Sequence, residues 1–123
     1  MGKLAQRYGD VARSGVYRVA DAGIPRAAAA EADALVLELG VAALADGGWQ
    51  QVEDAIGLRR AGARVVLVPD AGLLALPGNQ GLVEALRAAA QTCRDAGRPF
   101  FAVLVDPGAR LALPPLYKEG ERV

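Results

Sequence analysis

The sequence contains no histidine, and its one cysteine is Cys93. Without histidine, the chain cannot form a Ser-His or Cys-His nucleophile pair, a histidine metal site or an imidazole proton shuttle. A single cysteine cannot form an internal disulfide, so cysteine usage gives no indication of an oxidising compartment. The residue types that support much hydrolytic and metal-dependent chemistry are therefore missing or scarce, and no cofactor is expected.

The chain also lacks an excess of charge of either sign, because its 14 basic and 14 acidic side chains give a formal net charge of zero. Bulk nucleic-acid binding needs an electropositive surface, so this balance predicts no nucleic-acid partner. No run approaches the ~18–20 apolar residues of a membrane span, and the N-terminus has no apolar run typical of a signal peptide. We therefore expect a cytoplasmic protein with no membrane partner.

Apolar strand-like runs alternate with amphipathic segments along the 123 residues, of which 53% are hydrophobic. The predicted strands are residues 15–19, 35–39, 65–68 and 99–105, and the predicted helices are residues 24–33, 46–60 and 79–96. The second run reads as a strand buried on both faces, which is typical of parallel sheets covered by helices. The pattern predicts an α/β fold with a small parallel sheet of three to four strands and helices packed around it.

The sequence divides into three parts. Residues 1–13 read as a polar N-terminal arm, 14–106 as the α/β domain and 107–123 as a proline-containing tail. The apolar piece Leu111–Tyr117 of that tail either covers its own core, which we favour, or docks on a neighbour. We expect a monomer or a weak oligomer.

The helix predicted over 46–60 has one apolar stripe. Trp49, Val52, Ala55 and Ile56 recur at positions i, i+3, i+6 and i+7, which places them on one face. In the plainest interpretation, Trp49 anchors the helix to the core and the acidic residues of the opposite face are simply solvated.

Three acidic residues follow or end predicted strands, namely Glu38, Asp70 and Asp106. Ligands of open parallel sheets bind outside the carboxyl ends of the strands, and three converging carboxylates could hold Mg²⁺. Turn chemistry explains the same residues, because Asp70 and Asp106 each lie in a short segment with glycine. A small α/β enzyme or ligand-binding domain that uses these acids is the alternative function. Cys93 lies on an apolar stripe and is expected in the core.

The segment Gly48–Ile56 reads Gly-Trp-Gln-Gln-Val-Glu-Asp-Ala-Ile. It resembles the helix signature of the barstar family, the intracellular inhibitors of guanyl-specific ribonucleases, which reads roughly Asn-Trp-Asp-Ala-Leu-x-Asp-x-Leu. Trp49 matches the aromatic residue, Val52 and Ile56 match the two leucines, and Asp54 matches the second aspartate.

The resemblance extends over residues 14 to about 106. The run 95–105 is similar to the family's closing helix, glycine-containing turn and terminal strand, and the opening 14–19 looks like bacterial barstar-like proteins. The resemblance implies a three-layer barstar-like fold. It also implies a non-catalytic role as an inhibitor or antitoxin rather than an enzyme.

The resemblance further implies a protein partner, a basic ribonuclease or another protein, bound through the 46–54 segment. The residues implied in partner binding are Asp46, Trp49, Gln50, Glu53 and Asp54. Gln50 stands where the family has its first inhibitory aspartate, and the loop before the helix is short. Carboxylates facing a site built for phosphates would speed association with a basic partner.

Overall fold

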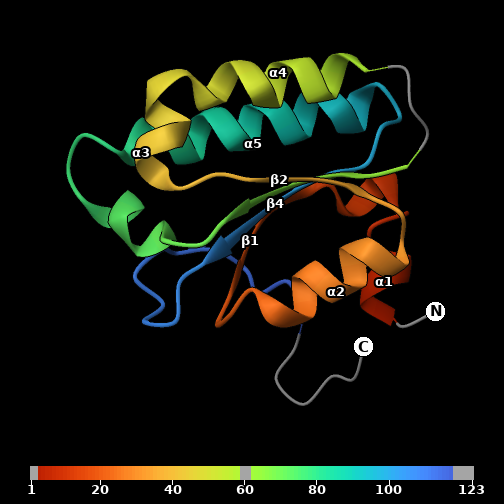
Figure 1. Cartoon of the computed structure of the whole chain (residues 1–123), viewed down its shortest axis with the longest axis horizontal. Coiled ribbons are helices and arrows are strands. Elements are labelled where there is room, and N and C mark those ends of the chain that lie inside the picture. Colours follow the sequence, from red (N-terminus) through yellow and green to blue (C-terminus); the bar gives the residue numbers. More distant parts are fainter. Residues whose placement is uncertain (1–2, 59–61, 118–123) are drawn as a thin grey trace.

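The alternating apolar runs form one parallel sheet between two layers of helices in the computed structural model of the chain (Figure 1). The structure describes residues 3–58 and 62–117. The strands are β1 (Gly15–Val19), β2 (Leu35–Glu38), β3 (Arg64–Val68) and β4 (Phe100–Val105). They lie in the order β1-β4-β3-β2, and every neighbouring pair is parallel. The predicted α/β class with a small parallel sheet is confirmed.

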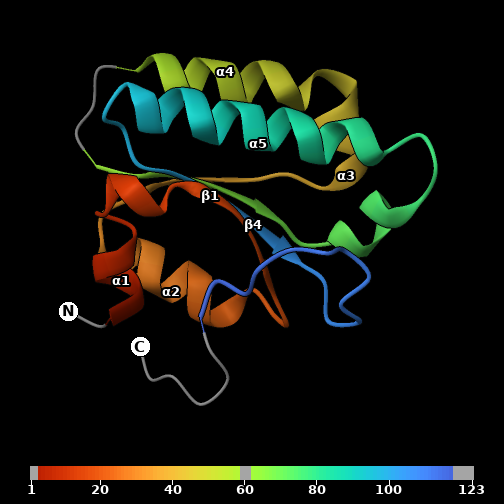
Figure 2. The same ribbon diagram turned by 180° about the vertical axis from the view of Figure 1, so that it is seen from behind.

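Helices cover both faces of this sheet. They are α1 (Lys3–Arg7), α2 (Gly23–Glu31), α3 (Val41–Ala43), α4 (Trp49–Gly57) and α5 (Gln80–Asp95), with short turns η1 (Val11–Arg13), η2 (Leu44–Gly48) and η3 (Ala71–Ala75). α4 and α5 lie side by side on one face, and α1 and α2 lie on the other (Figures 1 and 2). The predicted end of the α4 helix at Arg60 lies outside the described residues.

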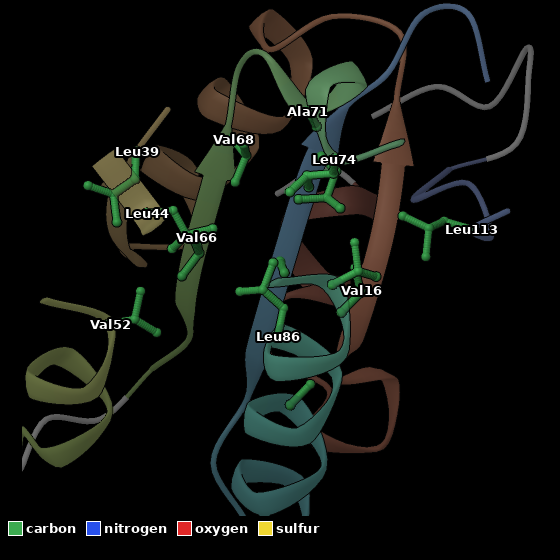
Figure 3. Close-up of a cluster of buried hydrophobic side chains, with 14 of the residues drawn as sticks. Val16, Leu39, Leu44, Val52, Val66, Val68, Ala71, Leu74, Leu86 and Leu113 are labelled. Atoms are coloured by element: carbon green, nitrogen blue, oxygen red, sulfur yellow. The ribbon is translucent and has the colours of Figure 1, made fainter. Parts of the chain in front are cut away.

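Side chains of the central strands alternate between two hydrophobic cores. Val66 and Ala102 are paired in the β3–β4 register and face α4 and α5 (Figure 3), whereas Val65 and Phe101 face α1 and α2. All residues of β3, and all but the last of β4, are buried. Both strands therefore need a cover on each face, which explains their nearly continuous apolar sequences.

The prediction that residues 35–39 form a strand buried on both faces is wrong. β2 pairs only with β3 and lies at the edge of the sheet, where its first three residues are partly exposed and Glu38 is exposed. Glu38, the most exposed of them, forms an ion pair with Arg26 of α2. The run is apolar because both faces of the strand still pack partly on a core: Leu37 on the core under α4 and α5, and Val36 on the core under α1 and α2.

Both chain ends take part in packing. In the segment expected to be a polar arm, Leu4 and Tyr8 are fully buried, and the Tyr8 ring meets that of Phe101 edge-on with centroids 5.1 Å apart. These two residues are four apart, so a helix brings them to one face. The C-terminal tail covers its own core, as expected, with Leu113 and Leu116 buried. The parts of the arm and the tail before residue 3 and after residue 117 lie outside the described residues.

Burial raises the pKa of Tyr8 above its ordinary value of 10.0. The folded state therefore favours the neutral phenol over the phenolate. The folded protein keeps its full stability at this residue below about pH 10, where an unfolded tyrosine titrates, and loses stability as the pH rises further. We expect the free energy of unfolding, measured with urea, to fall less between pH 8 and pH 11 in Tyr8→Phe than in the unmodified protein.

At pH 8 the Tyr8→Phe variant should lose no more than about 1 kcal/mol, because the Tyr8 hydroxyl makes only a long, 3.5 Å hydrogen bond to the Pro25 carbonyl. An identical alkaline loss in both proteins would contradict the assignment.

Candidate functional site

A backbone kink sets the start of helix α4. After β2 the chain makes the single turn α3 and then bends at η2, where Asp46 leaves helical geometry and Gly47 has φ +88°. Glycine adopts this left-handed conformation without steric cost. The bend brings Gly48 against the Ala43 backbone, too close for any side chain at position 48. As a result, α3 and the start of α4 lie at the end of the molecule where the strands finish (Figure 1).

The predicted apolar stripe of α4 faces the core. Val52 and Ala55 are buried, and Trp49 is partly buried against the same cluster. The opposite face therefore points to solvent. The candidate residues Gln50, Glu53 and Asp54 on this face are exposed, and so is Asp46 in η2, just before the helix.

Two side-chain hydrogen bonds order this exposed face. Trp49 Nε1 donates to Glu53 Oε1 at 2.9 Å, and Gln50 Nε2 donates to Asp54 Oδ1 at 2.9 Å. Each pair spans four residues, the spacing at which helix side chains are neighbours. The two donors are neutral, so neither bond pairs its carboxylate with a positive charge, and each carboxylate keeps a second oxygen outside these bonds. The structure thus brings four of the five predicted residues together in two pairs.

None of the site carboxylates Asp46, Glu53 and Asp54 forms an ion pair with any described residue. Elsewhere, exposed acids do pair with arginines, as Glu38 does with Arg26 and Glu84 with an arginine one turn along α5. The exposed face of α4 therefore carries negative charge that nothing in the described part of the chain neutralises. In a chain of zero net charge, this is a local acidic face.

A buried arginine holds the other end of α4. Arg64, at the start of β3, is 3% exposed, and its guanidinium donates to the carbonyls of Ala55 (3.1 Å), Leu58 and Gly62 (3.0 Å). Arg98 donates to a further carbonyl at this end. The bonds to Ala55, Ile56 and Leu58 satisfy carbonyls at the end of the helix, and the positive charges of the two arginines stabilise the negative end of the helix dipole. Sequence reasoning missed this role, although a charge opening an otherwise apolar strand was a signal.

The acids at the strand ends have separate partners. Glu38 is ion-paired, Asp70 accepts the Val41 N–H at 2.9 Å, and the buried Asp106 accepts the Leu111 N–H at 2.7 Å. Within residues 3–58 and 62–117, no three histidine, cysteine or acidic side chains lie close enough to hold a metal ion. Asp106 thus fixes the turn after β4, which was the competing interpretation, whereas Asp70 reaches across to the first N–H of α3.

Neither Cys93 nor the pocket beside α5 offers a second candidate site. Cys93 is 1% exposed, and burial raises the pKa of its thiol although Arg64 and Arg98 act in the opposite direction. It is a core side chain, as expected. A pocket of about 420 Å³ beside the start of α5 is lined by both Glu84 and Arg110, so its charges favour neither an anion nor a cation.

Comparisons with protein-family models, curated proteins and solved structures each find no match to this chain. In the part of the chain that the structure describes, no helix combines the length and the apolar character needed to cross a membrane.

Two glycines of the α4 region form a matched test of the kink. A Cβ at Gly48 would lie 2.8 Å or less from backbone atoms of Ala43, whereas one at Gly57 would meet nothing within 4 Å. We expect Gly48→Ala to lower the free energy of unfolding by at least about 2 kcal/mol, because backbone must move. Gly57→Ala should be neutral or up to ~1 kcal/mol more stable. Urea titrations giving equal effects would contradict the close approach.

Replacing Arg64 by methionine tests the anchor of α4. The variant keeps much of the side-chain length but removes three hydrogen bonds to carbonyls, so we expect a loss of about 2–4 kcal/mol in urea unfolding. The matched control is Arg98→Met, which removes one exposed hydrogen bond and should lose under ~1 kcal/mol. Equal losses in the two variants would show that Arg64 does not anchor the helix.

Proposed function

We propose that the chain is a non-catalytic protein-binding module of the barstar type, which binds a basic nuclease or another basic protein through its 46–54 segment. The observation that carries the proposal is the exposed face of α4, where Asp46, Glu53 and Asp54 have no ion-pair partner among the described residues. The sequence resemblance points to the same segment.

Rigidity of the segment supports this proposal. Val52 and Ala55 fix one side of α4 to the core, and Arg64 holds its last turns. A surface held in its binding conformation loses little freedom when a partner arrives, so more of the interaction energy appears as affinity.

Chemistry of the segment favours a cationic partner with an apolar contact beside its charges. Trp49 is partly exposed, and tryptophan is among the residues that contribute most at protein interfaces. Its N–H is already bonded to Glu53, so the ring contributes apolar area rather than a new hydrogen bond. Carboxylates placed in a phosphate-binding site would occupy it without reacting, which is how such a module would inhibit a ribonuclease in the cytoplasm.

The association rate should depend only modestly on charge, because Gln50 replaces a family aspartate and the chain has zero net charge. A few local carboxylates steer a basic partner, but the molecule as a whole does not. Association should therefore be slower at higher salt, with a modest dependence that reflects the α4 face alone.

The test compares two matched variants of the full chain. The tagged chain is used to capture proteins from the source lysate, and a captured basic protein is then purified and its binding measured by surface plasmon resonance. We expect Trp49→Ala with Asp54→Asn to raise Kd at least ~100-fold. Glu84→Gln, an exposed carboxylate on α5, should change Kd by less than about twofold, because rim or distant charges contribute little.

Two further measurements make the outcome decisive. Raising the salt from 50 to 300 mM should slow association of the unmodified chain and should have less effect on the double variant. When the captured protein is a ribonuclease, cleavage of a guanosine-containing RNA should stop at one equivalent of chain. Unchanged capture and affinity in a folded double variant would overturn the proposed face.

A further inference from the structure

The C-terminal segment Leu113–Tyr117, here called the strap, runs along the outer edge of β1. The Arg18 N–H donates to the Pro114 carbonyl at 3.0 Å, and the Leu116 N–H donates to the Arg18 carbonyl at 3.1 Å. Arg18 and Pro115 form a parallel β-bridge. The strap therefore adds a short strand to the edge of the sheet that β2 does not occupy.

Two leucines of the strap enter opposite cores. Leu113 lies beside Val16 in the core under α4 and α5 (Figure 3), whereas Leu116 belongs to the core that includes Tyr8 and Val19. They are 7% and 1% exposed. The strap thus clamps the edge of β1 with one apolar side chain on each face of the sheet.

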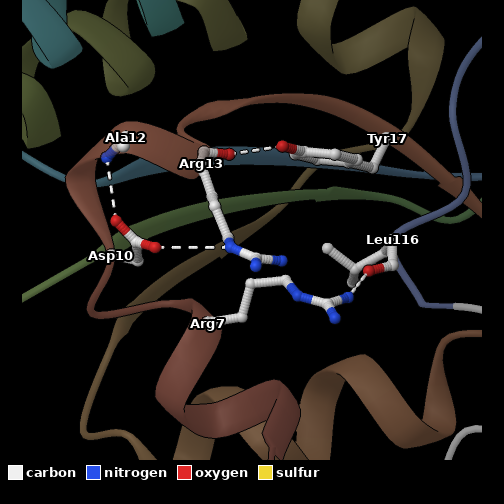
Figure 4. Close-up of polar contacts among 6 residues, drawn as sticks. All are labelled: Arg7, Asp10, Ala12, Arg13, Tyr17 and Leu116. Carbon is white, nitrogen blue, oxygen red and sulfur yellow. Dashed lines mark hydrogen bonds and ion pairs between the residues drawn. The ribbon is translucent and has the colours of Figure 1, made fainter.

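Arginine side chains hold the backbone of the strap. Arg18 Nε donates to the Leu113 carbonyl at 3.1 Å, and Arg7 of α1 donates to the Leu116 carbonyl (Figure 4). Between the leucines, Pro114 and Pro115 are exposed and restrict the segment to an extended conformation. Backbone bonds to a strand edge, with pockets for selected side chains, are the way that sheets bind peptides.

The connection between β4 and the strap is largely exposed. Residues 107–110 are exposed, and Ala109 has φ +49°, a left-handed conformation that is unfavourable for an alanine. A turn bond joins the Ala109 N–H to the Asp106 carbonyl at 3.0 Å. The contacts on β1 hold the strap itself, and the bond from the Leu111 N–H to the buried Asp106, 2.7 Å long, fixes the chain just before it.

We propose that the outer edge of β1 is a peptide-binding groove for an extended Leu-Pro-Pro-Leu-Tyr segment, and that the strap is its detachable intramolecular ligand. While the strap is bound, it keeps the β1 edge from pairing with another chain. Once it is released, the groove accepts the same segment supplied as a separate peptide. This inference uses none of the residues 46–54, so it does not depend on the proposed function.

The test uses the full chain with a protease recognition sequence inserted after Gly108, folded first and cut afterwards. A fluorescently labelled peptide of residues 109–117 is then added, and its binding is followed by anisotropy. We expect one peptide to bind per cut chain. The uncut chain should bind it at least ~100-fold more weakly, because the attached strap competes at a millimolar effective concentration.

Two peptide variants identify the contacts. A peptide with Leu113→Asp and Leu116→Asp should show no binding, since both pockets are apolar, whereas one with Ala109→Gly should bind as well as the unmodified peptide. The proposal is overturned if the labelled peptide does not bind the cut chain, if the Asp peptide binds equally, or if cutting unfolds the chain. In that last case the strap would be an inseparable part of the fold.

Discussion

The two central strands, β3 and β4, are buried on both faces, and this constraint organises the rest of the molecule. A sheet only four strands wide exposes apolar side chains on two sides, so each side must receive its own cover. α4 and α5 supply one cover, and α1 and α2 supply the other. Leu113 and Leu116 complete the two cores beside the β1 edge.

The same constraint produces the candidate binding surface. Because Val52 and Ala55 are needed against the sheet, the opposite side of α4 is left for solvent. Arg64 belongs to β3 itself and donates to the end of α4, so the central strand directly fixes the helix that carries the acidic face. The contacts that pack α4 on the sheet are therefore the same contacts that expose its acidic face.

Sequence patterns were sufficient for the parts of the fold that depend on local periodicity. The long apolar runs predicted the strands, and the stripe from Trp49 to Ile56 predicted which side of α4 is exposed. The position of β2 at an edge could not be predicted, because strand order depends on contacts between distant segments. α1 was missed because it is only five residues long and Leu4 and Tyr8 stand among charged and polar residues. The donors that cap α4 were missed because Arg64 reaches carbonyls up to nine positions away.

The candidate site shows the same division. Its residues were implied by the family resemblance of the 48–56 segment, whereas their lack of ion pairs, in contrast to other exposed acids, could be found only in the structure. Trp49 is the only tryptophan of the chain, so its indole N–H gives a single, isolated NMR signal. If a captured basic partner binds through the 46–54 segment, this signal shifts or broadens when the partner is added to saturation. A complex that forms while the Trp49 signal stays unchanged would contradict binding through the 46–54 segment.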